Sequence, residues 1–351
     1  MVNRRKKGPG RLDTKTMLFP LFVVIAIALG LLLGTRTPSL SGPLSDYGIP
    51  VGIFFMIYPA MTRIRLEELG KSLRDIRTIS LMVILNYAIA PFLVAGLAYF
   101  FFFMVFYHLG LLSFAVTTQV FVGIILLGVA PCIAMVMVWT NLAHGNISKA
   151  VSFVAWNSLI QVATTPMLVY VLARTSVTIS PGLILESVLL YLALPLVAGI
   201  ATRKLLQGKA YFSRILNMMG TLQTIALLFT ILVIFWSQGS GIIAYPSLVW
   251  MVAIVMLTFY FALFQMGYLV ARKARYSYSD STAIGFTVSA RDFEVSIAIA
   301  VAAFSSYPYV VVTTAIGPLL EIPLMLFLVW VQLGRETRLN ETWRLAEVSK
   351  A

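Results

Sequence analysis

Charge is scarce in this 351-residue chain. Only 11% of the residues are charged, whereas 60% are hydrophobic, and the mean hydropathy is +0.93. A water-soluble globular protein needs a far more polar surface, because about a quarter of its residues are ordinarily charged. The composition therefore excludes a soluble protein and indicates a polytopic membrane protein.

Cysteine is also nearly absent, since Cys132 is the single thiol of the chain, and this excludes an internal disulfide. The sequence contains no zinc-ligand spacing, no Walker-type glycine loop and no Ser/His/Asp set. We therefore expect no enzymatic activity, no catalytic residues and no cofactor.

Long apolar runs dominate what is present. Many approach ~20 residues, the length that crosses a ~30 Å hydrocarbon core as a helix, and none shows the alternation of a barrel strand. The pattern predicts an all-α membrane protein, with one transmembrane domain over residues 1–351 and ten spans. The predicted spans are 17–34, 47–62, 78–104, 117–140, 148–172, 183–202, 217–237, 246–270, 281–304 and 308–333.

Basic residues are distributed unevenly between the connections. Ten spans place 23 of the 26 lysines and arginines on one side, leave Arg36 and Arg174 on the other, and put Arg291 inside a span. By the positive-inside rule, both termini are cytoplasmic, with tails at 1–16 and 334–351. A pI near 9.9 is also typical of nucleic-acid-binding proteins. We expect no nucleic acid here, because the charge is spread over juxtamembrane loops that face anionic lipid.

An internal repeat links the two halves. Span five ends "NSLIQVATTPMLVYVLA" and span ten reads "TAIGPLLEIPLMLFLVW", and the two align on Pro166 and Pro323. Five spans per half would invert the halves, giving repeats at 17–173 and 181–333 with a substrate site at broken helices near the midplane. The fourth span of each half carries the interruption, at Pro131-Cys132 and at "SARDFEVS" (289–296). We expect these broken helices to cross.

The first interruption contains the single thiol of the chain, directly after a proline. Pro131 removes a backbone donor and clashes with the preceding turn, and the freed carbonyls are tolerated only where backbone lines a cavity or is buried in protein. Cys132 follows at the expected start of the second half-helix, whose positive dipole end favours a thiolate, a soft-metal ligand. The alternative is that Cys132 is a small core residue.

The second interruption contains three ionisable residues. Arg291, Asp292 and Glu294 fall within four residues, at a depth where such groups are costly and usually functional. We interpret Glu294 as a reversible proton site and expect Arg291 to pair with Asp292 or another carboxylate; a purely structural ion pair is the alternative. Glu321, between two prolines of span ten, either joins a proton relay or caps a kink.

Three further residues are candidates for the substrate path. Trp139 lies seven residues after Cys132, two turns along the same helix face, so it either walls the path or belongs to the interfacial aromatic belt. Asn157 and Gln161 are four residues apart and share a face. Buried amides of this kind either bind a polar substrate or join helices.

The interrupted segments also resemble a known family. "APCIAMVMVWTNLAHGN" (130–146) is similar to the fourth-helix signature of the arsenite efflux permeases of the arsenical-resistance family, in the bile acid/arsenite/riboflavin transporter superfamily. "DFEVSIAIAVAAF" and "IGPLLEIPLML" resemble that family's ninth and tenth helices.

The resemblance implies that Cys132 contacts trivalent arsenic or antimony, that Glu294 couples protons, and that Trp139 and Asn157 matter for transport. The family usually has two asparagines where this chain has Arg291 and Asp292. That departure adds charge beside the site and bears on both the coupling ion and the substrate preference.

We therefore expect a plasma-membrane carrier that extrudes arsenite from the cytoplasm in exchange for protons, with antimonite as an alternative substrate. A sodium-coupled symporter for an organic anion such as a bile acid is the second hypothesis, and a non-transporting membrane sensor is the third. The sequence leaves open whether the chain forms a homo-oligomer and which ion it couples.

Overall fold

The computed structural model describes residues 14–37, 47–63, 70, 75–133, 135–174, 176–177 and 180–348. Within these ranges every named element is helical. The α-helices are α1 (Thr14–Arg36), α3 (Ile49–Thr62), α5 (Ile76–Val83), α6 (Ala90–Ala98), α7 (Phe114–Val129), α8 (Val136–Leu142), α9 (Ile147–Ala173), α10 (Pro181–Val188), α11 (Leu194–Leu206), α12 (Phe212–Ala244), α13 (Pro246–Lys273), α14 (Tyr278–Ser289), α15 (Phe293–Ala303) and α16 (Pro308–Val348). Three π-helical segments join some of them, η3 (Ile84–Ile89), η4 (Tyr99–Tyr107) and η5 (Leu189–Ala193).

Five helical stretches are long and apolar enough to cross a membrane. They are Ile76–Tyr107, Pro181–Leu206, Phe212–Ser240, Pro246–Lys273 and Pro308–Leu339. Four shorter helices are apolar as well, namely Leu21–Arg36, Ile49–Thr62, Phe114–Val129 and Phe293–Ala303. The predicted all-helical, multi-pass membrane architecture is confirmed, whereas the count of ten spans stays a prediction.

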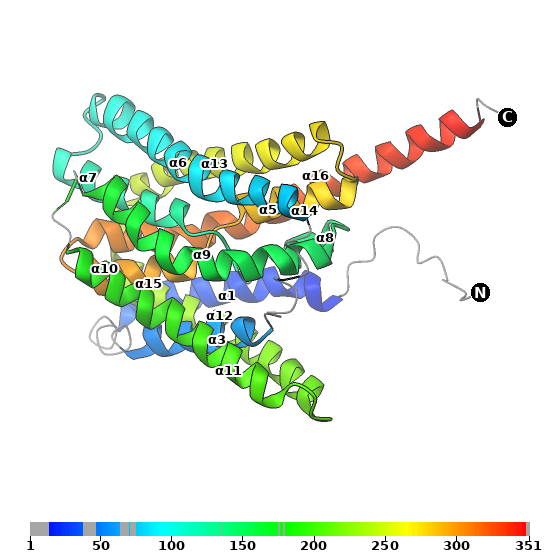
Figure 1. Cartoon of the computed structure of the whole chain (residues 1–351). Helices are drawn as coiled ribbons and strands as arrows, with labels where there is room; N and C mark the ends of the chain where they lie inside the picture. Colours follow the sequence, from blue (N-terminus) through cyan, green and yellow to red (C-terminus); the bar gives the residue numbers. More distant parts are fainter. Residues whose placement is uncertain are drawn as a thin grey trace.

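The helices form two layers. In the first, which we call the outer layer, α12 packs against α1 and α3, and α11 packs against α3. In the second, the crossover layer, α7 packs against α6 and α16, and α13 packs against α14 and α16, with α8, α9 and α15 alongside (Figure 1). Contacts between α15 and α3 and between α12 and α16 join the layers.

Two glycines allow α1 and α12 to approach closely. A Cβ atom on Gly30 would lie 2.6 Å from the carbonyl oxygen of Leu232, and one on Gly34 would lie 2.6 Å from that of Trp236. Small residues four apart permit this contact between membrane helices. The segment "GLLLG" therefore contributes to the outer layer.

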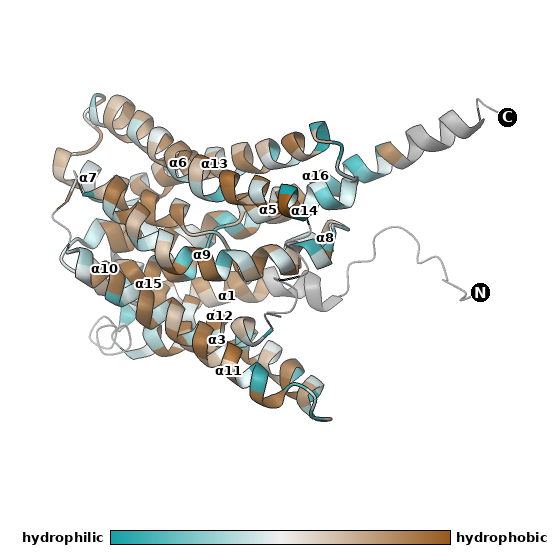
Figure 2. Cartoon of the chain, in the orientation of Figure 1, coloured by the Kyte–Doolittle hydropathy of each residue, from teal (hydrophilic) through white to brown (hydrophobic). Residues whose placement is uncertain are grey.

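Apolar side chains also cover the outside of the molecule. Hydrophobic residues run along the helices and hydrophilic ones gather towards helix ends, such as the start of α14 (Figure 2). Large exposed apolar residues include Phe22 of α1, Phe92 of α6, Val197 of α11 and Trp330 of α16. Such a surface suits contact with lipid rather than water.

The last helix extends further than the predicted span. α16 continues to Val348, so most of the expected tail at 334–351 is helical. The sequence after 333 is rich in Arg, Glu and Leu, which favour helix, and contains no proline to stop it. The start of α1 and the end of α16 lie at the same end of the molecule (Figure 1).

Candidate functional site

The first helix break is longer than the sequence indicated. α7 ends at Val129, Ala130 is extended, and α8 begins only at Val136. Cys132 therefore precedes the half-helix instead of opening it, although its Sγ still accepts a hydrogen bond of 3.3 Å from the Met135 N–H. The prediction that Trp139 follows Cys132 on one continuous helix face is wrong, because α8, which carries Trp139, begins only at Val136.

The second break is shorter and is capped by its own side chain. α14 ends at Ser289 and α15 begins at Phe293. The Asp292 carboxylate accepts a hydrogen bond of 3.1 Å from the Val295 N–H, which satisfies one orphan donor in the first turn of α15. The Asp292 side chain is therefore the N-cap of α15.

The two breaks pair with each other. Pro131 and Arg291 form an isolated antiparallel bridge. The Cys132 N–H donates to the Ala290 carbonyl oxygen at 3.1 Å, and the Asp292 N–H donates to that of Ala130 at 2.9 Å. Each break therefore supplies the hydrogen-bond partners that the other lost, as buried backbone requires in a membrane protein. We call this paired segment the crossover.

Arg291 is fully buried at the crossover. One guanidinium nitrogen, Nη2, donates to the Asn86 side-chain oxygen at 3.1 Å and to the Val288 carbonyl oxygen, and the group lies 5.6 Å from the centre of the Phe259 ring. Among the ion pairs in the described ranges, none involves this guanidinium. The expected ion pair of Arg291 with Asp292 or another carboxylate is therefore not formed within the described ranges: Asp292 caps α15, and Glu294 faces a cavity.

Glu321, which lies on α16, is hydrogen-bonded to the crossover. One carboxylate oxygen accepts from the Arg291 backbone N–H at 3.2 Å, and the other accepts from the Tyr260 hydroxyl of α13 at 3.1 Å. One donor lies in the second break and the other on α13, so the carboxylate does not cap a kink within α16. It ties α13, α16 and the second break together.

Glu294 points towards space between the two layers. It is 4% exposed, in the first turn of α15, and lines a cavity of about 470 Å³. Met56 of α3, Met135 of the first break and Met137 of α8 line the same cavity. The carboxyl group of Asp292 is close enough to interact electrostatically with that of Glu294. The two acidic groups repel each other when both are ionised, so a single proton between them relieves the repulsion.

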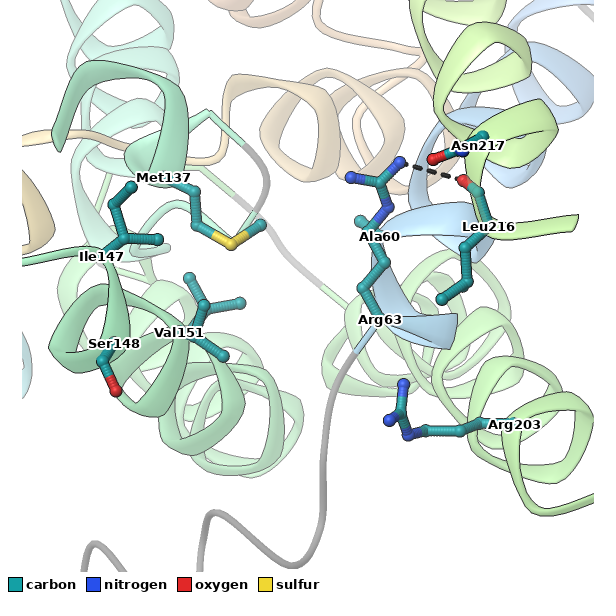
Figure 3. A pocket seen from close by; sticks show the side chains of 10 residues that line it. Ala60, Arg63, Met137, Ile147, Ser148, Val151, Arg203, Leu216 and Asn217 are labelled. Carbon is teal, nitrogen blue, oxygen red and sulfur yellow. Dashed lines mark hydrogen bonds between the residues drawn. The ribbon is translucent and has the colours of Figure 1, made fainter. Parts of the chain in front are cut away.

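A second cavity of about 580 Å³ adjoins the first and shares Arg63, Met137 and Ile147 with it. Figure 3 shows Met137, Ile147 and Val151 on one side and Arg63, Arg203 and Leu216 on the other. The first set belongs to the crossover layer, and the second belongs to or adjoins the outer layer. Arg63 donates a hydrogen bond of 3.1 Å to the Leu216 carbonyl oxygen on its own side of the cavity. The combined space, which we call the interlayer cavity, leads to Glu294.

Three further predicted residues are buried. Trp139 is 1% exposed, so the aromatic-belt interpretation is wrong: a belt side chain would face lipid and not the protein interior. The Asn157 side-chain oxygen accepts from the Asn86 amide at 3.5 Å and from the Tyr87 hydroxyl at 3.3 Å. Within the described ranges, the Gln161 amide and the Trp139 indole nitrogen have no hydrogen-bond partner.

Asn86 and Tyr260 were missed by sequence reasoning. Asn86 connects Arg291 to Asn157, and Tyr260 connects α13 to Glu321. An amide inside the otherwise apolar third span was the available signal for Asn86. Tyr260 gave none, because tyrosine is common in membrane helices.

Comparison with known proteins places these features in a family. Residues 50–245 match the sequence model of the sodium bile acid symporter family. The arsenical-resistance protein Acr3 of Corynebacterium glutamicum is 28% identical over 346 residues, covering 93% of this chain and 90% of that protein. An uncharacterized transporter of Synechocystis sp. is 30% identical, with 94% and 92% covered. Acr3 of Alkaliphilus metalliredigens is 29% identical, with 90% of each covered.

The match covers more than half of the chain, and the relatives match it over almost its whole length. The family model is described as one of symporters and the Synechocystis relative as a transporter, which agrees with the apolar helices and the interlayer cavity. The chain therefore belongs to the sodium bile acid symporter family and is a multi-pass membrane transporter, not an enzyme.

Proposed function

We propose that this transporter extrudes arsenite from the cytoplasm in exchange for protons, with antimonite as an alternative substrate. One observation carries the proposal: the chain's single thiol lies at the crossover, where its Sγ accepts the Met135 N–H. The two Acr3 relatives, which are named for arsenical resistance, support the proposal.

The chemistry of arsenite suits these groups. At neutral pH arsenite is a small uncharged hydroxide of a soft element, so arsenic favours a thiolate and its hydroxyls favour amide and carboxylate partners. Cys132 supplies the first kind of ligand, and Asn157, Gln161 and Glu294 supply the second, with Trp139 packing nearby in α8. A single thiol also allows release, which several thiols would prevent.

The interlayer cavity is the proposed route from the cytoplasm. An uncharged solute can pass Arg63 and Arg203 without ion pairing, whereas cations are repelled by two guanidinium groups. Cys132 is 1% exposed and is not among the described residues that line this cavity. Reaching the thiol therefore requires the two layers to shift, as in alternating access.

The proposed cycle uses inverted repeats and a proton. Repeats 17–173 and 181–333 would let one layer rock against the other around the crossover, with both termini cytoplasmic in the plasma membrane. Glu294 releases its proton when it faces the cytoplasm and takes one up from outside, which resets the carrier. Asp292, Arg291 and Glu321 set the charge around that step.

A sodium-coupled symporter for an organic anion is the second candidate. Arg63 and Arg203 line the interlayer cavity beside Val151, Val154 and Leu216, a mixture of charge and apolar surface that suits an amphipathic anion. Against it stands the thiol at the crossover, for which such a substrate has no use.

Expression in cells that lack their own arsenical efflux tests the proposal. Cells carrying the transporter should retain several-fold less arsenic than cells with an empty vector after loading with arsenite. Equal arsenic content, with the protein present in the membrane, would reject arsenite as the substrate. Uptake of labelled taurocholate under an inward Na⁺ gradient would instead support the second candidate.

A further inference from the structure

The end of α14 is capped by two side chains, those of Arg291, which lies just after the helix, and of Asn86 in η3. The last four carbonyl groups of a helix have no partner within it. Here the Val288 carbonyl oxygen accepts a hydrogen bond from the Arg291 guanidinium. The Thr287 carbonyl oxygen accepts one of 3.5 Å from the Asn86 side-chain amide. α7 ends at the same crossover, so two helix C-termini with their partial negative charge converge on this point.

The same region holds an excess of acidic groups. Asp292, Glu294 and Glu321 are all buried around the crossover, and Arg291 is the single lysine or arginine among the buried residues of the described ranges. In transporters with discontinuous helices, unwound carbonyls and half-helix C-terminal ends coordinate Na⁺. The crossover therefore has the oxygen atoms and negative potential that attract a cation.

We propose that the guanidinium of Arg291 is a tethered cation that fills the position a coupling sodium ion would occupy at this crossover. Its Nη2 contacts the Val288 carbonyl and the Asn86 side-chain oxygen, both of which are oxygen ligands suited to Na⁺. The fixed charge stabilises the helix ends and the carboxylates permanently. This transporter consequently binds no Na⁺ there, although it belongs to a family named for sodium symport. The inference rests on the crossover and does not depend on the substrate.

The placement of Arg291 favours this role over a simple packing role. Its Nε and Nη1 have no hydrogen-bond acceptor in the described part of the chain, although the residue is fully buried. Leaving such donors unpaired is costly, and a residue selected for packing alone would not need the charge. Electrostatic compensation of the surrounding carboxylates and helix ends supplies a reason to keep it.

Removing the guanidinium should create a sodium site. We would measure the unfolding midpoint of the purified protein in NaCl, KCl and choline chloride at equal ionic strength. The wild type should give the same midpoint in all three salts. Arg291→Asn should unfold earlier in choline chloride and regain about 3 °C or more in NaCl, as expected when a ligand binds only the folded state. Arg291→Lys keeps a tethered charge and should show no preference for Na⁺.

Arg272→Asn is the matched control. Arg272 also donates to a backbone carbonyl beyond a helix C-terminus, that of Tyr276 at 2.9 Å after α13, but it lies outside the crossover. Its removal should lower stability equally in all salts. If Arg291→Asn is not recovered folded, Arg291→Gln, which keeps more side-chain volume, replaces it.

Two results would overturn the proposal. One is a wild-type protein that Na⁺ stabilises more than K⁺ or choline does. The other is a folded Arg291 variant without positive charge that responds identically to all three salts. Neither measurement uses arsenite, so failure here leaves the proposed substrate standing, and failure of the substrate proposal leaves this inference testable.

Discussion

The backbone N–H of Cys132 donates a hydrogen bond to the carbonyl oxygen of Ala290 across the two helix breaks, at 3.1 Å. The bond joins the thiol-bearing segment to the segment that carries Arg291, Asp292 and Glu294. A displacement of either break is therefore transmitted directly to the other. The proposed substrate-binding thiol and the proposed proton-coupling carboxylates therefore lie on two segments that are hydrogen-bonded to each other.

Replacing Cys132 by serine should abolish arsenite efflux. Serine can still accept the Met135 N–H, so the fold should be retained, but the soft donor for arsenic is lost. Arsenic release from preloaded cells should fall to the rate of the empty vector, with unchanged protein in the membrane fraction. Normal release by Cys132→Ser would make the cysteine a packing residue.

Glu294→Gln should uncouple transport from pH. Glutamine resembles the protonated carboxyl group and cannot release a proton, so pH-driven efflux should be lost. Equilibrium dialysis with purified protein should still detect arsenite binding, because Cys132 is intact. Glu186→Gln, at an exposed position of α10, is the control and should transport normally. Wild-type proton dependence in Glu294→Gln would reject the assignment.

Tyr260→Phe should destabilise the crossover. The change removes the hydroxyl that donates to Glu321 and leaves one oxygen of a buried carboxylate without its donor. The expected loss in unfolding free energy is about 1–3 kcal/mol. Tyr268→Phe on the same helix removes a hydroxyl but keeps the ring beneath Arg335, so it should change stability by less than about 0.5 kcal/mol. Equal unfolding midpoints for the two variants would contradict the role of Tyr260.

Val151→Trp should obstruct the interlayer cavity. Val151 lines that cavity on α9, and a bulky indole there narrows the route between Met137 and Arg63. The initial rate of arsenite efflux should fall at least several-fold. Val171→Trp, at a 45% exposed position further along α9, adds the same ring to the outer surface and serves as the control. An unaffected rate in Val151→Trp would place the substrate route elsewhere.

Cysteine labelling can test the orientation, because the native Cys132 is buried and should react little. Lys209 and Tyr245 lie just before and just after α12, so they flank opposite ends of one span. With cytoplasmic termini, a membrane-impermeant maleimide should label Tyr245→Cys in intact cells and should label Lys209→Cys only after permeabilisation. The reverse pattern would invert the proposed topology.

Both helix breaks could be predicted from the sequence because their causes are local. Pro131 interrupts an apolar run, and Arg291 and Asp292 place charge where a membrane helix tolerates little. The position of Cys132 ahead of α8 was not predictable. It depends on hydrogen bonds with Ala290, which is remote in the sequence.

The hydrogen-bond partners of the charged residues could not be predicted from the neighbouring sequence either. The sequence suggested that Arg291 pairs with a neighbouring carboxylate, whereas the structure gives it Asn86 of the third predicted span and a carbonyl of α14. Likewise, the interlayer cavity draws its lining from α3, α8, α9, α11, α12 and α15. No spacing rule within one helix reveals which faces of these six helices meet.

Arsenite flux into everted membrane vesicles, with pH and Na⁺ gradients imposed separately, tests the proposed mechanism most directly. In such vesicles the cytoplasmic face is outside, so efflux appears as uptake. An acidic interior should drive arsenite accumulation in vesicles with the wild-type transporter and not in those with Cys132→Ser or Glu294→Gln, and a Na⁺ gradient alone should drive none. Accumulation that requires Na⁺ and ignores pH would contradict the account.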